Sequence, residues 1–155
     1  VFHNFYYTDK FNHPMSIKNS EEVMIEAYMQ GTEVTSGMYR TKNATCIFPI
    51  TEVVTDNEFF DYDAKYNGQV DEITPARVSD EITRQVQQTT EKIYRILNAK
   101  GIIRVDYIID ADENINLLEV NTTPGMTATS FIPQQVRAAG LDIADVMTEI
   151  IENEF

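Results

Sequence analysis

Cysteine is almost absent from the chain: Cys46 is the only thiol among 155 residues. A single thiol excludes an intrachain disulfide and a metal site built from cysteines, and it is typical of a reducing compartment. No apolar run approaches the roughly 20 residues that span a bilayer, and no apolar segment near the N-terminus is typical of a secretory signal. We therefore expect a soluble, cytoplasmic protein that does not contact a membrane.

Positive charge is also scarce. Lys and Arg number 12 against 25 Asp and Glu, which gives a formal net charge of −13. Such a field repels the phosphates of nucleic acids, so we expect no nucleic-acid partner. It would also repel a nucleotide substrate unless cations lay between them, which slightly favours chemistry assisted by a divalent metal. Hydrophobic residues make up 43% of the chain, enough for the core of one ordinary domain.

The chain reads as an unassigned leader over 1–20, followed by one domain over 21–155. Apolar and β-branched segments predict strands, and apolar residues three and four apart predict helices. The expected strands are 23–29, 33–40, 44–54, 102–110 and 115–121, and the expected helices are 80–99, 130–139 and 142–153. The first three strands would form an antiparallel meander, and the long connection 55–76 shows no period. The expected fold is α+β, a largely antiparallel sheet packed with helices.

Two of these strands form a predicted hairpin that is rich in charge, GIIRVDYIIDADENINLLEVN. If its turn is symmetric about the middle of 111–114, Asp106 lies opposite Glu119, and Arg104 lies opposite Asn121. Side chains alternate between faces with period two, so all four would converge on one patch. A slip of one residue would place the two carboxylates on opposite faces.

Directly opposed carboxylates lie about 5 Å apart at Cβ and repel each other, so a sheet does not keep such a pair for stability. Either one carboxyl holds a proton with a raised pKa, or a cation neutralises both. Asp106, Glu119 and Asn121 offer only oxygen ligands, which suits Mg²⁺ or Mn²⁺. A solvated face stays open as the alternative. A calcium loop that begins at Asp110 is excluded, because Ile115 stands where such a loop needs glycine.

A tight polar loop, NTTPGMTATS, follows the second strand of the hairpin. Gly125 lets the backbone approach a ligand closely, and Pro124 stiffens the turn. The N–H groups of this loop, together with Arg104, are suited to hold an oxyanion or a phosphate. Ser130, at the start of a predicted helix, is placed to bind a substrate carboxylate.

Three segments carry a resemblance to a known family: FFDYDAKY, RVDYIID and INLLEVNTTPGMTATSFIPQQVRAAG. They resemble signature segments of the ATP-grasp superfamily, and within it of the D-alanine:D-alanine ligases. The likeness extends from Glu22 to the C-terminus, as an ATP-grasp C-terminal domain. It departs at Phe60 and Phe131, where these ligases commonly have tyrosine and leucine. It implies a ligase that uses ATP to join two D-alanines through an acyl phosphate, for the peptidoglycan precursor.

The resemblance implies roles for the hairpin and for the loop that follows it. Asp106, Glu119 and Asn121 would hold two Mg²⁺ or Mn²⁺ ions, with Glu119 bridging them. Arg104 and the N–H of Gly125 would stabilise the tetrahedral oxyanion that forms when the second D-alanine attacks.

The resemblance also implies which residues bind the substrates. Ser130 and Lys65 would receive the carboxylate of the second D-alanine, and Tyr66 would belong to a loop that closes the site. The residues expected to contact ATP are Glu26 and Met29 on a hinge strand, Glu33 at the ribose, and Ile108.

Complete members of this family also carry an N-terminal domain, a glycine-rich phosphate loop and lysines that contact the ATP phosphates, which this sequence does not show. We therefore expect a C-terminal fragment that does not ligate alone, and a homodimer as a form of the complete protein. Two alternatives stay open: an ATP-grasp ligase with D-lactate or D-serine as acceptor, and a non-catalytic module that binds Mg²⁺ and nucleotide.

Overall fold

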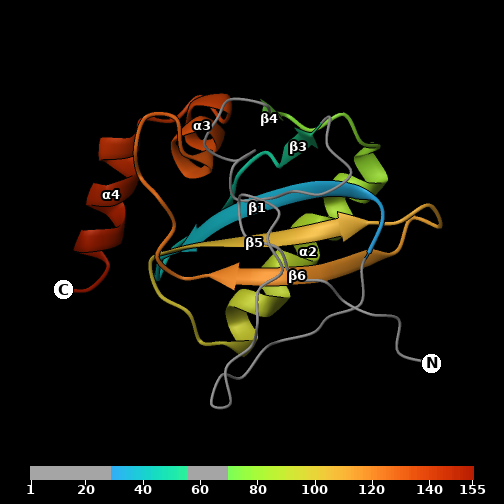
Figure 1. Cartoon of the computed structure of the whole chain (residues 1–155). Helices are drawn as coiled ribbons and strands as arrows, with labels where there is room; N and C mark the ends of the chain where they lie inside the picture. Colours follow the sequence, from blue (N-terminus) through green and yellow to red (C-terminus); the bar gives the residue numbers. More distant parts are fainter. Residues whose placement is uncertain (1–28, 56–69) are drawn as a thin grey trace, which may run out of the picture.

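The computed structural model describes residues 29–55 and 70–155, and their core is a six-stranded antiparallel sheet (Figure 1). Its strand order is β4-β3-β1-β5-β6, and β2 pairs with β1 beside this path. The strands are β1 (Thr32–Arg40), β2 (Thr45–Ile47), β3 (Thr51–Thr55), β4 (Val70–Ile73), β5 (Ile102–Ile109) and β6 (Ile115–Asn121). The helices are α2 (Asp80–Ile96), α3 (Phe131–Ala138) and α4 (Ile143–Glu152). The expected α+β class is confirmed.

Helix α2 covers one face of the sheet and builds the larger core cluster. Ser79 begins it by accepting a hydrogen bond from the Ile82 N–H at 3.2 Å. Its buried side chains pack on the inward residues of β1 and β5, among them Val34, Val105 and Tyr107. Period-two alternation therefore gives these central strands a largely apolar face, on which Ser36 is a buried polar residue. No helix in the described ranges is long and apolar enough to cross a bilayer.

Helices α3 and α4 pack on the opposite face, near the end of β1 (Figure 1). Their apolar residues join a second core cluster, which contains Tyr39, Phe48, Ile102, Ile132, Val136 and Val146. Because Gly37 on β1 contacts α3 and pairs with Arg104 on β5, α3 lies on the same face as the predicted site. The face under α2 thus holds the larger core cluster. The opposite face, here called the mixed face, holds the core residues under α3 and α4 as well as the predicted site.

The hairpin register matches the prediction at the site but not at the turn. Arg104 pairs with Asn121 and Asp106 with Glu119, whereas Tyr107 pairs with Leu117, so Leu118 is an extra residue in a β-bulge. The turn itself is therefore not symmetric about the middle of 111–114. Its shape follows from the Asp110 carboxylate, which accepts hydrogen bonds from two N–H groups of the turn, at 3.0 and 2.8 Å. The bulge restores the register that brings the carboxylates together.

Two other expectations need correction, and one lies outside the described residues. The single strand expected over 44–54 is wrong, because the chain breaks at 48–50 into β2 and β3, on either side of Pro49. The connection 55–76 is not patternless, because β4 forms within it. The expected strand 23–29 lies outside the described residues except for Met29, as does the FFDYDAKY segment.

Candidate active site

Arg104 lies at the centre of the charged patch and contacts both carboxylates. Its Nε donates to Asp106 Oδ1 at 2.9 Å, and one terminal nitrogen donates to Asp106 Oδ2 at 2.7 Å. The same nitrogen reaches Glu119 Oε1 at 3.2 Å. The Arg104 and Asp106 side chains are only 10% and 9% exposed, whereas the Glu119 side chain is 59% exposed. A guanidinium thus supplies the countercharge that the opposed carboxylates require.

This arrangement corrects one step of the sequence argument. From the sequence, a proton or a metal ion was expected to offset the repulsion between the two acids. The structure adds a third means, because Arg104, two residues from Asp106, bonds to both carboxylates. Burial disfavours the charged guanidinium of Arg104, yet hydrogen bonding to Asp106 and the nearby negative charges outweigh it and raise its pKa. Arg104 therefore stays cationic at every physiological pH, and it is further held by Phe131, whose ring centroid lies 5.3 Å away.

The predicted metal ligands fit a hard cation by their chemistry. Asp106 and Glu119 are cross-strand partners, and Asn121 follows on the same face of β6. Asn121 Oδ1 accepts a hydrogen bond from the Thr123 N–H at 3.0 Å, which fixes the amide with its oxygen toward the loop. Within residues 29–55 and 70–155, no group of three or more His, Cys, Asp or Glu is placed to hold a metal. A site here therefore depends on the amide as its third ligand, as Mg²⁺ and Mn²⁺ accept.

The loop after β6 brings two more predicted residues together. A Cβ on Gly125 would lie 2.9 Å from Ser130 Oγ, so the absence of a side chain at Gly125 allows this close approach. Ser130 is the N-cap residue of α3, but its hydroxyl makes no hydrogen bond to the helix. It bonds instead to the Thr127 hydroxyl at 2.8 Å. Since Phe131 follows Ser130 and covers Arg104, the loop and the charged patch form one continuous site.

Strand β1 supplies the neighbouring part of the same face. Glu33 pairs with Ile108, so these two predicted ATP contacts lie side by side, and Met29 is half-buried just before the strand. Thr35 pairs with Asp106 and was not foreseen. Its hydroxyl is buried and has no hydrogen-bond partner among the described residues, which is unusual for a buried polar atom. Strand alternation would have placed Thr35 in the site. The remaining predicted residues, Glu26, Lys65 and Tyr66, lie outside the described residues.

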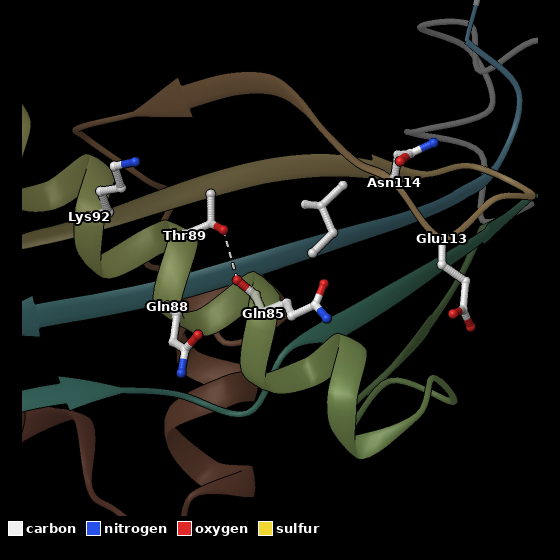
Figure 2. Close-up of a pocket in the computed structure, with 7 residues that line it drawn as sticks. Gln85, Gln88, Thr89, Lys92, Glu113 and Asn114 are labelled. Carbon is white, nitrogen blue, oxygen red and sulfur yellow. Dashed lines mark hydrogen bonds between the residues drawn. The ribbon is translucent and has the colours of Figure 1, made fainter.

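A hollow of about 550 Å³ lies elsewhere on the surface, between α2 and the turn that joins β5 to β6 (Figure 2). Exposed polar side chains line it, including Gln85, Lys92 and Glu113. The one hydrogen bond drawn there runs from the Thr89 hydroxyl to the Gln85 carbonyl at 2.8 Å, within the helix itself. None of the predicted site residues lines this hollow, so we assign it no role.

Comparison with known proteins agrees with the sequence resemblance. Residues 12–152 match the family model described as "D-ala D-ala ligase C-terminus". A D-alanine--D-alanine ligase of Bacteroides fragilis is 74% identical over 140 residues, which are 90% of this chain and 43% of the relative. The chain thus spans less than half the length of the curated relatives it matches.

Solved structures give the same result. The D-alanine--D-alanine ligase from Bacillus anthracis aligns with a TM-score of 0.66 at 32% identity, over 83% of this chain and 41% of that one. The same ligase complexed with ATP aligns with a TM-score of 0.65 at 31% identity, over 81% and 40%. The VanG D-Ala:D-Ser ligase from Enterococcus faecalis aligns with a TM-score of 0.69 at 27% identity, over 83% and 37%.

Proposed function

Because the chain belongs to the family of D-ala D-ala ligase C-termini, we propose that it is part of a longer, cytoplasmic ligase that uses ATP to join two D-alanines for the peptidoglycan precursor. The observation that carries the proposal is the convergence of Arg104, Asp106, Glu119 and Asn121 on one sheet face, beside the loop that ends at Ser130. Binding of a metal alone would not need an arginine and a serine at its edge.

The charged patch is suited to chemistry at a phosphorylated carboxylate. Asp106, Glu119 and Asn121 would hold two Mg²⁺ or Mn²⁺ ions, which neutralise the charge of ATP phosphates when bound. Arg104, which is cationic and held beside the loop, would stabilise the oxyanion that develops when an amine attacks the acyl phosphate. The backbone N–H of Gly125 would be its second donor.

The rest of the mixed face is suited to bind the substrates. ATP would lie along β1 and β5, with Glu33 at the ribose, Ile108 beside it, and Glu26 and Met29 at the base; the ATP complex of the Bacillus anthracis ligase supports nucleotide use by the family. Ser130, whose hydroxyl is not used to cap α3, would bind the carboxylate of the acceptor.

Lys65 would join Ser130 at the acceptor carboxylate, and Tyr66 would close the loop over the site. D-serine is a second candidate for the acceptor, because the VanG enzyme has the same fold and is named a D-Ala:D-Ser ligase.

The test is phosphate release from ATP by the complete protein that contains this chain. D-alanine alone should support turnover that depends on Mg²⁺ or Mn²⁺, and Asp106→Asn should reduce turnover by about a hundredfold or more, because a ligand and a countercharge change together. Asp112→Asn, the same chemical change on the exposed turn, is the matched control and should have no effect. Turnover of Asp106→Asn equal to that of the unmodified protein would contradict the proposal.

Acceptor competition separates the alternatives. With D-alanine as donor, D-serine and D-lactate are each offered as acceptor and the products are identified by mass. A mixed product formed in preference to D-alanyl-D-alanine would identify a ligase of different specificity. Binding of Mg²⁺ and ATP in a calorimeter, without turnover of any acceptor, would identify a non-catalytic module.

A further inference from the structure

The α3 residue Gln135 makes an unusual set of contacts with the sheet. Its side chain is fully buried, and a buried amide is costly unless its hydrogen bonds are made. Gln135 Oε1 accepts from the Gly37 N–H at 2.9 Å. Gln135 Nε2 donates to the Thr35 carbonyl at 3.0 Å and to the Thr51 hydroxyl at 3.1 Å. One side chain on a helix therefore bonds to two adjacent strands.

The reason lies in the break between β2 and β3. These two short strands pair with β1 at either end, but the chain between them, 48–50, is not in strand conformation. The Gly37 N–H lies opposite this break, whereas Thr35 is paired with Thr51 at the start of β3. A backbone N–H that is buried without a partner is expensive. Gln135 Oε1 therefore supplies the acceptor that a continuous neighbouring strand would offer to Gly37, and Gln135 Nε2 adds a donor to the Thr35 carbonyl at the edge of the break.

Gly37 makes room for the Gln135 side chain. A Cβ at Gly37 would lie 2.5 Å from Gln135 Oε1 and 2.4 Å from Ile132 Cδ1, so α3 can approach β1 this closely only over a glycine. The position of the helix along and above the sheet is thus defined by polar contacts with fixed geometry. The neighbouring apolar contacts of α3 tolerate small shifts more easily.

Gln135 is linked to the candidate site through its own helix. Phe131 lies four residues earlier, hence on the same side of α3, and its ring covers Arg104. Ser130 precedes Phe131 and lies against Gly125. A shift of α3 over the sheet would therefore move the acceptor-binding hydroxyl and the aromatic cover of Arg104 together.

We propose that Gln135 is a positioning residue: its amide fixes α3 on the sheet and so places Ser130 and Phe131 relative to Arg104. The inference rests on the proposed ligase function. It concerns the acceptor side of the reaction, because none of the proposed ATP contacts is on α3. Gln135 itself touches neither substrate.

The test compares Gln135→Leu with Val136→Ala in the complete protein. Val136 is also fully buried on α3, but it makes only apolar contacts in the second core cluster, so it is a matched control for loss of packing. Gln135→Leu should raise the KM for the acceptor D-alanine about tenfold and leave the KM for ATP unchanged, since small misplacements in a site are expensive. Val136→Ala should change neither KM, although it lowers the melting temperature.

A milder variant keeps the test decisive if Gln135→Leu does not fold. Thr51→Val removes one of the three hydrogen bonds of the amide and should raise the acceptor KM about threefold. An unchanged acceptor KM in Thr51→Val, or an equal rise in Val136→Ala, would overturn the positioning role. If the unmodified protein ligates no D-amino acid, the proposed function fails instead, and the two failures are thereby distinguished.

Discussion

Replacing Arg104 with methionine should make the stability of this chain depend on a divalent metal. The Arg104 and Asp106 side chains are about one-tenth exposed and are joined by two short hydrogen bonds. Removing one partner of a buried pair typically costs about 3–5 kcal/mol, because the other charge remains buried and unpaired. The contact to Glu119 adds little, because that carboxylate is 59% exposed. We expect a loss of about 3 kcal/mol in the free energy of unfolding.

The assay is urea unfolding at neutral pH with and without Mg²⁺ or Mn²⁺. In Arg104→Met, a metal ion at a hundred times its dissociation constant should restore about 2.7 kcal/mol, because it binds only the folded chain. In the unmodified chain the ion must compete with the guanidinium for Asp106, so the same concentration should stabilise less. Arg84→Met is the matched control, since Arg84 also pairs with a carboxylate, but its side chain and that of Glu81 are 65% and 62% exposed; its unfolding midpoint should shift far less.

The double variant Arg104→Met with Asp106→Asn separates charge from packing. It removes the unpaired carboxylate together with the arginine, so it should regain most of the lost stability and lose the response to metal. A loss below about 1 kcal/mol in Arg104→Met would refute the reasoning, because it would show that the pair contributes no more than an exposed one. A double variant as unstable as the single one would show that packing on Phe131, not charge, explains the loss.

Two smaller predictions concern the sheet and its covering helix. Hydrogen bonds from Arg77 hold the pKa of Glu52 below its ordinary value of 4.5. Because the folded-state pKa is depressed, this stabilisation is present at neutral pH and is lost as the pH falls. The urea midpoint of Glu52→Gln should therefore decline less steeply than that of the unmodified chain between about pH 6 and about pH 3. Burial raises the pKa of Tyr107 to about 12, and its hydroxyl is paired with Thr90 at 2.8 Å. Thr90→Val should therefore cost about 1–3 kcal/mol in denaturant unfolding, and the same change at the more exposed Thr89 should cost much less.

The parts of the site that follow from period-two alternation could be read from the sequence. Arg104 and Asp106 share a face because they are two residues apart on one strand, and Glu119 joins them as the cross-strand partner of Asp106. The structure has this arrangement. The identity of the countercharge could not be read in this way. Whether a long guanidinium folds back onto a carboxylate two residues away depends on its rotamer and on the cover that Phe131 provides, and neither is encoded in strand spacing.

The remaining differences arise from contacts between distant segments. The end of β2 at 47 and the start of β3 at 51 follow from Pro49 together with a buried amide from α3. That amide, on Gln135, is 84 residues beyond Thr51 in the chain, so local strand propensity does not reveal it. A buried glutamine on a helix gives no periodic signal, so Gln135 looked like an ordinary helix residue. The turn of the hairpin differed for a local reason, the carboxylate of Asp110, which could have been recognised as a side chain that bonds to the backbone.

The bulge at Leu118 also affects how the molecule meets its neighbours in solution. Strand β6 is the last strand in the described sheet order, and it displays Leu117 and Leu118, which are 50% and 45% exposed. A regular edge strand with exposed apolar side chains would ordinarily be a template on which another chain adds a strand. The extra residue interrupts the regular row of donors and acceptors and increases the local twist. By this reasoning, the irregularity that aligns the two acids also makes β6 a poorer template for an added strand.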